Sequence, residues 1–307
     1  MKKKGFTLVE LLVVIAIIAL LMGILMPALA RVRQLAFRMT CGTNLSGIGK
    51  AMLIYANDYE DELPKAGGRN STWGAVTNWQ HANRNTAFGM SADGTGGKAT
   101  ITSCFYLLVK YAEVTPKSFI CKGDSGTAEF KLADIPNLPS GFELIDAWDF
   151  GDSGKSGCLN WKSCSYSYHL PYGSNYALTV SSEPGFAVAA ERNPWFPSPA
   201  GEATAWNLFQ PDITGMGGTT DQAKAGNAVA HQQEGQNVMF LDTHVEFEKR
   251  AYCSVEDDNI YTPGINANGD EKGTQPTLTS IPVSRKDSLL MHDPETFGGT
   301  GGGATRS

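Results

Sequence analysis

Basic residues are scarce in this chain of 307 residues and nowhere form a long block. Lys and Arg number 25 against 31 Asp and Glu, which gives a formal net charge of −6. Nucleic-acid binding needs clustered positive charge, so we expect no nucleic-acid partner. Charged residues make up 18% of the chain and apolar residues 42%. This composition excludes a wholly disordered chain and a protein with many membrane spans.

Sequence signatures of enzymes are also lacking. The chain contains no H-E-x-x-H, G-x-S-x-G or C-x-x-C pattern, so zinc-protease, serine-hydrolase and dithiol redox sites of those kinds are not expected. His231, Asp242 and His244 offer ligand atoms, but ordinary turn and strand-edge roles account for them. We therefore expect no enzyme activity, no catalytic residue, no cofactor-binding residue and no cofactor.

One long stretch lacks charge altogether. Residues 11–30 carry no ionisable side chain, and as a helix they would span about 30 Å, the thickness of a bilayer's hydrocarbon core. Lysines at positions 2–4 favour a cytoplasmic N-terminus and an extracytoplasmic head, although the arginines at 31, 33 and 38 weaken this orientation. A cleaved secretory signal and an uncleaved single-pass anchor are the alternatives, but a secretory signal usually has a shorter apolar core.

Glu10 is unusual at the start of an apolar run. A carboxylate that enters hydrocarbon costs a few kcal/mol unless a cation lies at the same depth. Cleavage after Gly5 would create such a cation, because Phe6 would then carry a protonated α-amino group. The amine and Glu10 can meet within one helix or between neighbouring subunits. A Glu10 side chain that stays solvated at the membrane edge is the alternative.

Residues 1–30 resemble a known family. Residues 4–10 read Lys-Gly-Phe-Thr-Leu-Val-Glu and look like the leader of type IV prepilins and type II secretion pseudopilins. The resemblance implies that prepilin peptidase removes residues 1–5 by cleaving between Gly5 and Phe6, and that Phe6 is N-methylated. It also implies that Glu10 guides subunit registration in a filament. Pro27 falls where many pilins have a proline, and it predicts a kink or local melting of the helix.

The apolar pattern changes after the membrane segment. From residue 45, apolar side chains recur in steps of three and four, which predicts an amphipathic helical stripe: Leu45, Ile48, Met52, Tyr55 and Tyr59. We expect residues 6–30 to form a transmembrane and filament-core helix, and residues 31–59 its amphipathic continuation. Because each glycine weakens a helix by about 1 kcal/mol, a break near Cys41–Gly42 is an alternative.

Residues 60–255 are expected to form a globular α+β head, in which an antiparallel β-sheet packs on the long helix as in pilins. One further helix is expected at 103–113. The clearest strand signal is a β-hairpin at 237–248, and shorter strands are expected at 118–121, 164–169, 174–181 and 186–191. Residues 256–307 are expected to form a loop-rich, partly flexible tail, which can dock on the head through residues 288–291.

A second resemblance involves the stalk and the head. It rests on Cys41, Asn44-Leu45, Ile48-Gly49, Ala51, Tyr55, Phe119-Ile120-Cys121, and His231 followed by residues 237–242. These residues are similar to those of large-headed pilin-like proteins that end in an H-x9-D-G segment. Here ten residues separate His231 from Asp242, and Thr243 replaces the glycine. The resemblance implies no activity for the head.

Two groups of polar residues leave alternatives open. Calcium prefers oxygen ligands, and four residues near the C-terminus of the head are weak calcium candidates: Asp257, Asp258, Asn268 and Asp270. Some pseudopilins bind calcium in this region of the head. The alternative is that these residues form solvated turns. Six cysteines can form disulfides in an exported head or remain buried thiols, and the sequence does not choose their pairing: Cys41, Cys104, Cys121, Cys158, Cys164 and Cys253.

The leading hypothesis is a structural subunit. The chain would be an inner-membrane, single-pass precursor that prepilin peptidase trims and that assembles with other pilin or pseudopilin subunits into a type II secretion or type IV pilus-like filament. The alternative is a membrane-tethered extracytoplasmic module that binds polysaccharide or protein and never polymerises.

Overall fold

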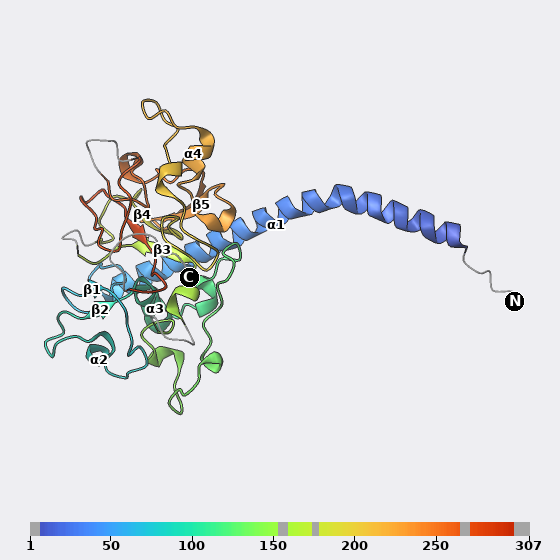
Figure 1. Cartoon of the computed structure of the whole chain (residues 1–307). Helices are drawn as coiled ribbons and strands as arrows, with labels where there is room; N and C mark the ends of the chain where they lie inside the picture. The colour runs from blue at the N-terminus through green and yellow to red at the C-terminus, as the bar shows by residue number, and fades with distance from the viewer. Residues whose placement is uncertain (1–6, 153–158, 174–177, 265–270, 298–307) are drawn as a thin grey trace.

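One long helix organises the molecule (Figure 1). The computed structural model describes residues 7–152, 159–173, 178–264 and 271–297. Helix α1 runs without interruption from Leu8 to Asp58. Its first half projects from the head as a bowed rod, and its second half passes into the head (Figure 1). The helix is therefore confirmed at nearly the expected length, while residues 1–6, which include the expected cleavage and methylation positions, lie outside the described residues.

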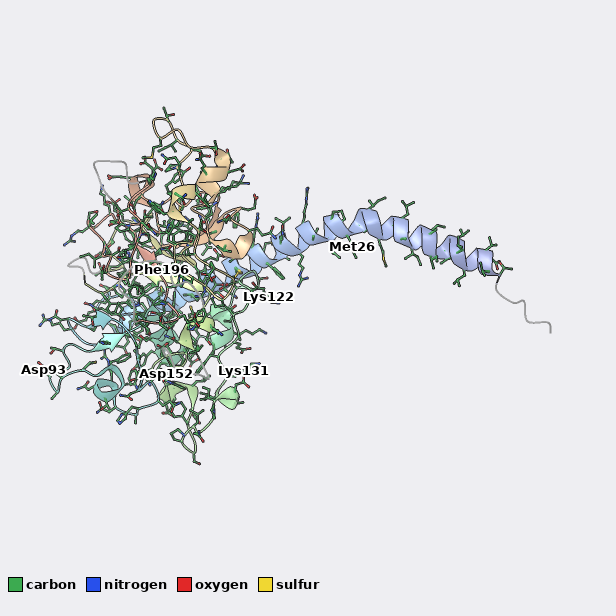
Figure 2. All side chains as sticks on the ribbon, viewed as in Figure 1. Met26, Asp93, Lys122, Lys131, Asp152 and Phe196 are labelled. Carbon is green, nitrogen blue, oxygen red and sulfur yellow. A yellow bond between two sulfur atoms is a disulfide. The ribbon has the colours of Figure 1, made fainter. Side chains whose placement is uncertain are left out.

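Pro27 and the glycines of α1 do not break it. The helix is continuous through Pro27, so no local melting is found there, and Met26 lies near the crest of the gentle bow in Figure 2. The alternative of a break near Cys41–Gly42 was wrong. A Cβ at Gly42 would lie 3.0 Å from Asn237 Oδ1, and one at Gly49 would lie 2.6 Å from Met239 Sδ. Glycine lets the helix approach the sheet here, and that packing offsets the weak helix propensity.

A mostly buried antiparallel sheet lies beside α1. Within the described residues its order is β6-β5-β4-β3-β7, and all of its pairings are antiparallel. Only β6 is partly exposed. The strands are β3 (Tyr166–His169), β4 (Ala187–Glu191), β5 (Gln236–Phe240), β6 (Val245–Glu248) and β7 (Leu290–Met291). The expected fold class, a long helix on an antiparallel sheet, is confirmed.

The two faces of the sheet pack against different layers. Met239 belongs to the same core as Leu45 and Ile48 of α1, and this core also contains α3 (Ile101–Tyr111). The alternate residues Val238 and Phe240 belong to a second core formed with the loops beyond the sheet. The head thus has a helical layer, a sheet and a loop layer, which explains why residues of both strand faces are buried.

The remaining elements are short. Two β-strands pair in parallel, β1 (Thr72–Trp73) and β2 (Lys98–Ala99). Two short α-helices lie at the edges of the head, α2 (Arg84–Phe88) and α4 (Thr220–Lys224). Turns of 3₁₀ helix join the rest: η1 (Pro116–Phe119), η2 (Leu132–Asp134), η3 (Leu144–Asp146), η4 (Asn160–Lys162), η5 (Trp206–Leu208), η6 (Val229–His231) and η7 (Val255–Asp257).

Most of the expected elements of the head are present. The helix at 103–113, the strands at 164–169 and 186–191, and the hairpin at 237–248 correspond to α3, β3, β4 and β5–β6. The strand expected at 118–121 was wrong, because Pro116 starts the 3₁₀ helix η1 there. The strand expected at 174–181 is reduced to an isolated bridge at Thr179 within its described part, and residues 174–177 lie outside it.

Part of the expected tail is built into the head. Strand β7 pairs with β3, with Met291 opposite Tyr168. Two residues later, the Asp293 carboxylate accepts hydrogen bonds from Ile101 N at 2.9 Å and Thr102 N at 2.7 Å. It thereby satisfies free donors at the start of α3. The described segment up to Phe297 therefore includes core residues, and residues 298–307 lie outside the described part of the chain.

Candidate functional site

The first half of α1 is apolar and makes few contacts with the head. Its large apolar side chains from Leu8 to Val32 are between 45% and 76% exposed, and the buried residues of α1 begin at Cys41. Among the described residues it is the one helix long and apolar enough to cross a membrane, with a mean hydropathy of 3.1 in its most apolar window. Such a surface needs lipid or other apolar helices around it.

Glu10 caps its own helix. Its Oε2 accepts hydrogen bonds from Thr7 N at 2.8 Å and Thr7 Oγ1 at 2.7 Å, and Thr7 Oγ1 accepts one from Glu10 N at 3.3 Å. This reciprocal pair is a capping box. The Thr-x-x-Glu spacing was visible in the sequence and was missed. In the described part of the chain no hydrogen bond is recorded to Glu10 Oε1, and Phe6 lies outside it.

A buried polar cluster lies where α1 enters the head. A disulfide joins Cys41 of α1 to Cys121 after η1, with their Cα atoms 5.2 Å apart. His231 Nε2 lies 3.7 Å from Cys121 Sγ and 3.0 Å from Glu191 Oε1. Asn237 Nδ2 donates to Glu191 Oε1 at 2.7 Å, and Asn237 N donates to Glu191 Oε2. The disulfide and these polar contacts draw together α1 and elements of the head far apart in sequence.

Further contacts hold the helix at this junction. Asn44 Nδ2 donates to Ile120 O at 3.2 Å. Gln34 Nε2 donates to Gln232 Oε1 at 2.7 Å. The Arg38 guanidinium lies 4.4 Å from the centre of the Phe247 ring, a cation–π contact. Together with the disulfide, these contacts fix the direction in which α1 leaves the head.

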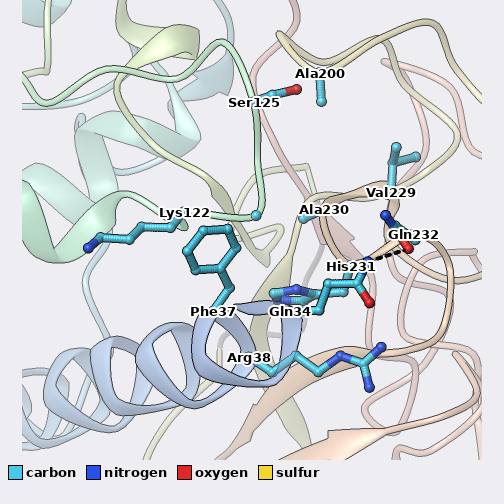
Figure 3. Close-up of a pocket in the computed structure, with 11 residues that line it drawn as sticks. Gln34, Phe37, Arg38, Lys122, Ser125, Ala200, Val229, Ala230, His231 and Gln232 are labelled. Atoms are coloured by element: carbon cyan, nitrogen blue, oxygen red, sulfur yellow. Dashed lines mark hydrogen bonds between the residues drawn. The ribbon is translucent and has the colours of Figure 1, made fainter. Parts of the chain in front are cut away.

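A cavity of about 290 Å³ opens beside the junction. Figure 3 shows Phe37 and Arg38 of α1 on one side and the η6 segment, which ends at His231, on the other. Lys122 also lines the cavity, although its side chain points away from the others (Figure 3). His231 lines both this cavity and the buried cluster, so it connects the cluster with the surface.

Two buried carboxyl groups flank the start of α3. Asp149 Oδ2 accepts from Thr100 Oγ1 at 2.6 Å, and Asp149 Oδ1 accepts from Phe150 N at 2.7 Å. Burial, with the nearby Asp293 carboxyl, raises the pKa of Asp149 to about 8. Burial also raises the pKa of Asp293. Both groups are at most 1% exposed, so they stabilise the helix end and do not face solvent.

Comparison with known proteins identifies the start of α1. Residues 1–26 match the prokaryotic N-terminal methylation motif. This methylation motif is typical of type IV pilins and pseudopilins, and it confirms the resemblance predicted from residues 4–10. The methylation motif implies processing by prepilin peptidase, and with the apolar helix it fits a membrane-anchored protein of pilin type. No curated protein and no solved structure matches the chain.

The other cysteines that the structure describes form no disulfide. Cys104, Cys164 and Cys253 are free thiols. Burial raises the pKa of Cys104 and of Cys164 to about 12, so both stay protonated and unreactive at neutral pH. Cys158 lies outside the described residues. The structure therefore pairs Cys41 with Cys121. Cys104 and Cys164 are buried and pack as apolar side chains, and Cys253 is partly buried.

The calcium candidates are only partly described. Asp258 is buried, and its Oδ2 accepts a hydrogen bond from Ser288 N at 2.7 Å. The neighbouring Asp257 is exposed. Asn268 and Asp270 lie outside the described residues. Calcium binding here stays a prediction.

The three candidate ligands 231, 242 and 244 do not form one group. His244 Nδ1 contacts Asp242 Oδ1 at the exposed turn of the hairpin, whereas His231 is buried against Glu191. Reasoning from sequence missed Glu191 and Asn237. One signal for Glu191 was available, because it is the charged residue that ends the otherwise apolar strand β4.

Proposed function

We propose that this protein is a structural subunit of a type II secretion or type IV pilus-like filament. The precursor lies in the inner membrane with its N-terminus cytoplasmic and its head extracytoplasmic. Prepilin peptidase cleaves it after Gly5, and Phe6 is N-methylated. One observation carries the proposal: the methylation motif lies on an apolar half-helix that its own head leaves exposed. That surface can be covered by lipid before assembly and by the helices of other subunits afterwards.

Glu10 is the proposed registration point. In the single chain both hydrogen bonds from Thr7 go to Glu10 Oε2. Its charge still needs a cation when the helix is surrounded by apolar groups, and the Phe6 amine of a neighbouring subunit supplies one. A subunit out of register would leave both charges unpaired at a cost of several kcal/mol.

The packing surface of the half-helix also fits close assembly. Ala19 and Gly23 lie one turn apart, a small-xxx-small pair that lets helices approach in an apolar medium. A Cβ placed at Gly23 would have no neighbour within 4 Å. The space over Gly23 is therefore open in one chain and available to a second helix.

Mass spectrometry of the intact protein from its native membrane tests the proposal first. A chain that begins at N-methyl-Phe6 supports prepilin processing. A chain that begins at Met1 contradicts it and favours a tethered binding module, and one that begins at Arg31 indicates an ordinary exported protein.

Two substitutions at Glu10 then test the registration role. Glu10→Ala removes the charge and the helix cap, whereas Glu10→Gln keeps an oxygen that can accept from Thr7. We expect both variants to abolish filaments seen by electron microscopy, while Asp58→Ala at the far end of α1 assembles normally. Filaments formed by Glu10→Gln but not by Glu10→Ala would show that capping, not charge pairing, is what assembly needs.

A further inference from the structure

The cluster at the entry of α1 contains the ligand set of a metal site. The sulfurs of Cys41 and Cys121, a carboxylate oxygen of Glu191 and a ring nitrogen of His231 all lie within 4.8 Å of one another, and all four residues are buried. Thiolate, imidazole and carboxylate are the ligands that zinc takes in proteins. We propose that reduction of the Cys41–Cys121 disulfide turns this cluster into a four-coordinate site for a zinc-type divalent cation.

The distances outside the disulfide are close to those of such a site. Metal–ligand bonds of about 2.0–2.3 Å place the ligand atoms of a tetrahedron about 3.3–3.8 Å apart. Cys121 Sγ lies 3.7 Å from His231 Nε2, and His231 Nε2 lies 3.0 Å from Glu191 Oε1. Once the disulfide is reduced, cation binding would separate the two sulfurs and widen the gap between His231 Nε2 and Glu191 Oε1 by a few tenths of an ångström, in place of their hydrogen bond.

A supporting contact holds the carboxylate ligand in place. Asn237 donates to Glu191 Oε1 from Nδ2 at 2.7 Å, and to Glu191 Oε2 from its backbone N. Asn237 Nδ2 also donates to Arg38 O of α1 at 3.2 Å. Hydrogen bonds of this kind orient metal ligands and raise their affinity. Glu191 is therefore held toward the cluster whether or not a cation is present.

The chemistry balances with a dithiol as reductant. The dithiol transfers two electrons and two protons to the disulfide and is itself oxidised to a disulfide. Each cysteine then loses its proton to water as its thiolate binds the cation. Neutral His231 binds through Nε2, and Glu191 binds as the carboxylate. Two thiolates and one carboxylate leave a charge of about −1 around a divalent ion, and Arg38, which lines the adjoining cavity together with His231, supplies a nearby positive charge.

The proposed site performs the same structural task as the disulfide. Cys41 lies on α1, while the other three ligands lie in separate segments of the head. A bound cation would therefore keep the helix joined to the head when the covalent link is absent. The proposal does not rest on filament assembly and can fail or succeed independently of it.

Cobalt(II) titration of the full chain in detergent micelles tests the site. The chain is reduced with a thiol-free phosphine, which avoids a competing ligand. We expect one cobalt per reduced chain, with the thiolate charge-transfer and visible bands of a tetrahedral ion, and loss of these bands when zinc is added. The oxidised chain should give no such spectrum. Zinc should raise the melting temperature of the reduced chain but not that of the oxidised chain.

Matched variants identify the ligands. Cys41→Ala with Cys121→Ala should abolish the cobalt spectrum, and Cys253→Ala, which removes a free thiol elsewhere, should keep it. Asn237→Ala should weaken cobalt affinity roughly 10- to 100-fold, because it removes support and not a ligand.

Near-ultraviolet circular dichroism of each sample reports whether the head is folded. A reduced chain that is folded but lacks the cobalt absorption bands overturns the proposal. The same holds if the double cysteine variant keeps the cobalt absorption bands of the reduced chain unchanged. If reduction unfolds the head, refolding on addition of cobalt supports the site, and failure to refold overturns it.

Discussion

The two halves of α1 share one continuous helix and meet opposite surroundings. Leu20 in the first half is 68% exposed, whereas Leu45 and Ile48 in the second half are fully buried. The first half is apolar on every side, and the second has one apolar stripe. A helix with one apolar stripe buries that stripe against one neighbouring surface. A helix that is apolar all round needs lipid or protein on all sides. The head therefore folds on one half and leaves the other exposed, as the proposed membrane and filament roles require.

Removing the covalent link between helix and head should have the largest effect on stability. Cys41→Ala with Cys121→Ala opens a loop with a sequence separation of 80 residues, for which chain entropy predicts a loss of about 4.5 kcal/mol. Urea unfolding of the oxidised chain, followed by tryptophan fluorescence, measures this. A loss similar to that of Cys253→Ala would mean that the link adds nothing beyond packing.

Truncating one buried side chain of the stripe should come next. Ile48→Ala creates a cavity between α1 and the sheet and should destabilise the head by about 3 kcal/mol. Ile17→Ala, which removes the same atoms from the exposed half, should leave the unfolding midpoint of the head unchanged. Equal effects of the two variants would show that the halves are not energetically distinct.

Adding one methyl group at a glycine should have a smaller effect. Gly49→Ala forces a Cβ to 2.6 Å from Met239 Sδ, and such overpacking should destabilise the head by about 2 kcal/mol. Gly47→Ala, on the same helix but with no atom within 4 Å of the new Cβ, should stabilise it by up to about 1 kcal/mol. Denaturant midpoints of the two variants should therefore shift in opposite directions.

The head should also respond to pH in a way that the exposed half cannot. Asp149, whose pKa is raised to about 8, keeps its proton in the folded state, while the unfolded chain releases it above about pH 4. The part of the stability that comes from Asp149 should therefore fall as pH rises from 4 to 8 and level off above pH 8, while the buried histidines His169 and His292, whose pKa values burial lowers, act in the opposite direction below about pH 6.5.

Asp149→Asn isolates this contribution. The unfolding free energy of the wild type minus that of Asp149→Asn should decrease between pH 5 and pH 8, because this difference removes the contributions of the other titrating groups. The exposed control Asp134→Asn should keep the wild-type slope. If the unfolding free energies of Asp149→Asn and wild type change in parallel with pH, the Asp149 carboxyl does not titrate in this range.

Elements with a clear period could be predicted from sequence. The stripe through Leu45, Ile48, Met52 and Tyr55 gave the buried face of α1, and alternation gave the hairpin of β5 and β6. Strand β7 could not be predicted as a sheet member, because its two residues carry no period and their partner is β3, more than 100 residues earlier. The prediction of a strand at 118–121 was wrong for a local reason. It gave more weight to the apolar residues 119–121 than to Pro116, which favours the start of a helix.

The buried cluster at the junction was beyond prediction from spacing. Cys41, Cys121, Glu191 and His231 come from four segments, and only the tertiary structure brings them together. Two of the four could be recognised as cysteines of unknown pairing, and His231 as a candidate ligand grouped with Asp242 and His244, which are not its neighbours in the structure. A role for Glu191 depends on the tertiary structure, which brings its carboxylate beside the His231 ring.

The place of the disulfide along α1 has a mechanical consequence. Cys41 is the first buried residue of the helix after its exposed half. A pulling force applied to the exposed half therefore reaches a covalent bond before it reaches Leu45 or Ile48. The load passes into the head at Cys121 and does not peel the helix from the sheet one turn at a time. The disulfide therefore bears the tension, and the apolar contacts of Leu45 and Ile48 with the sheet are spared it.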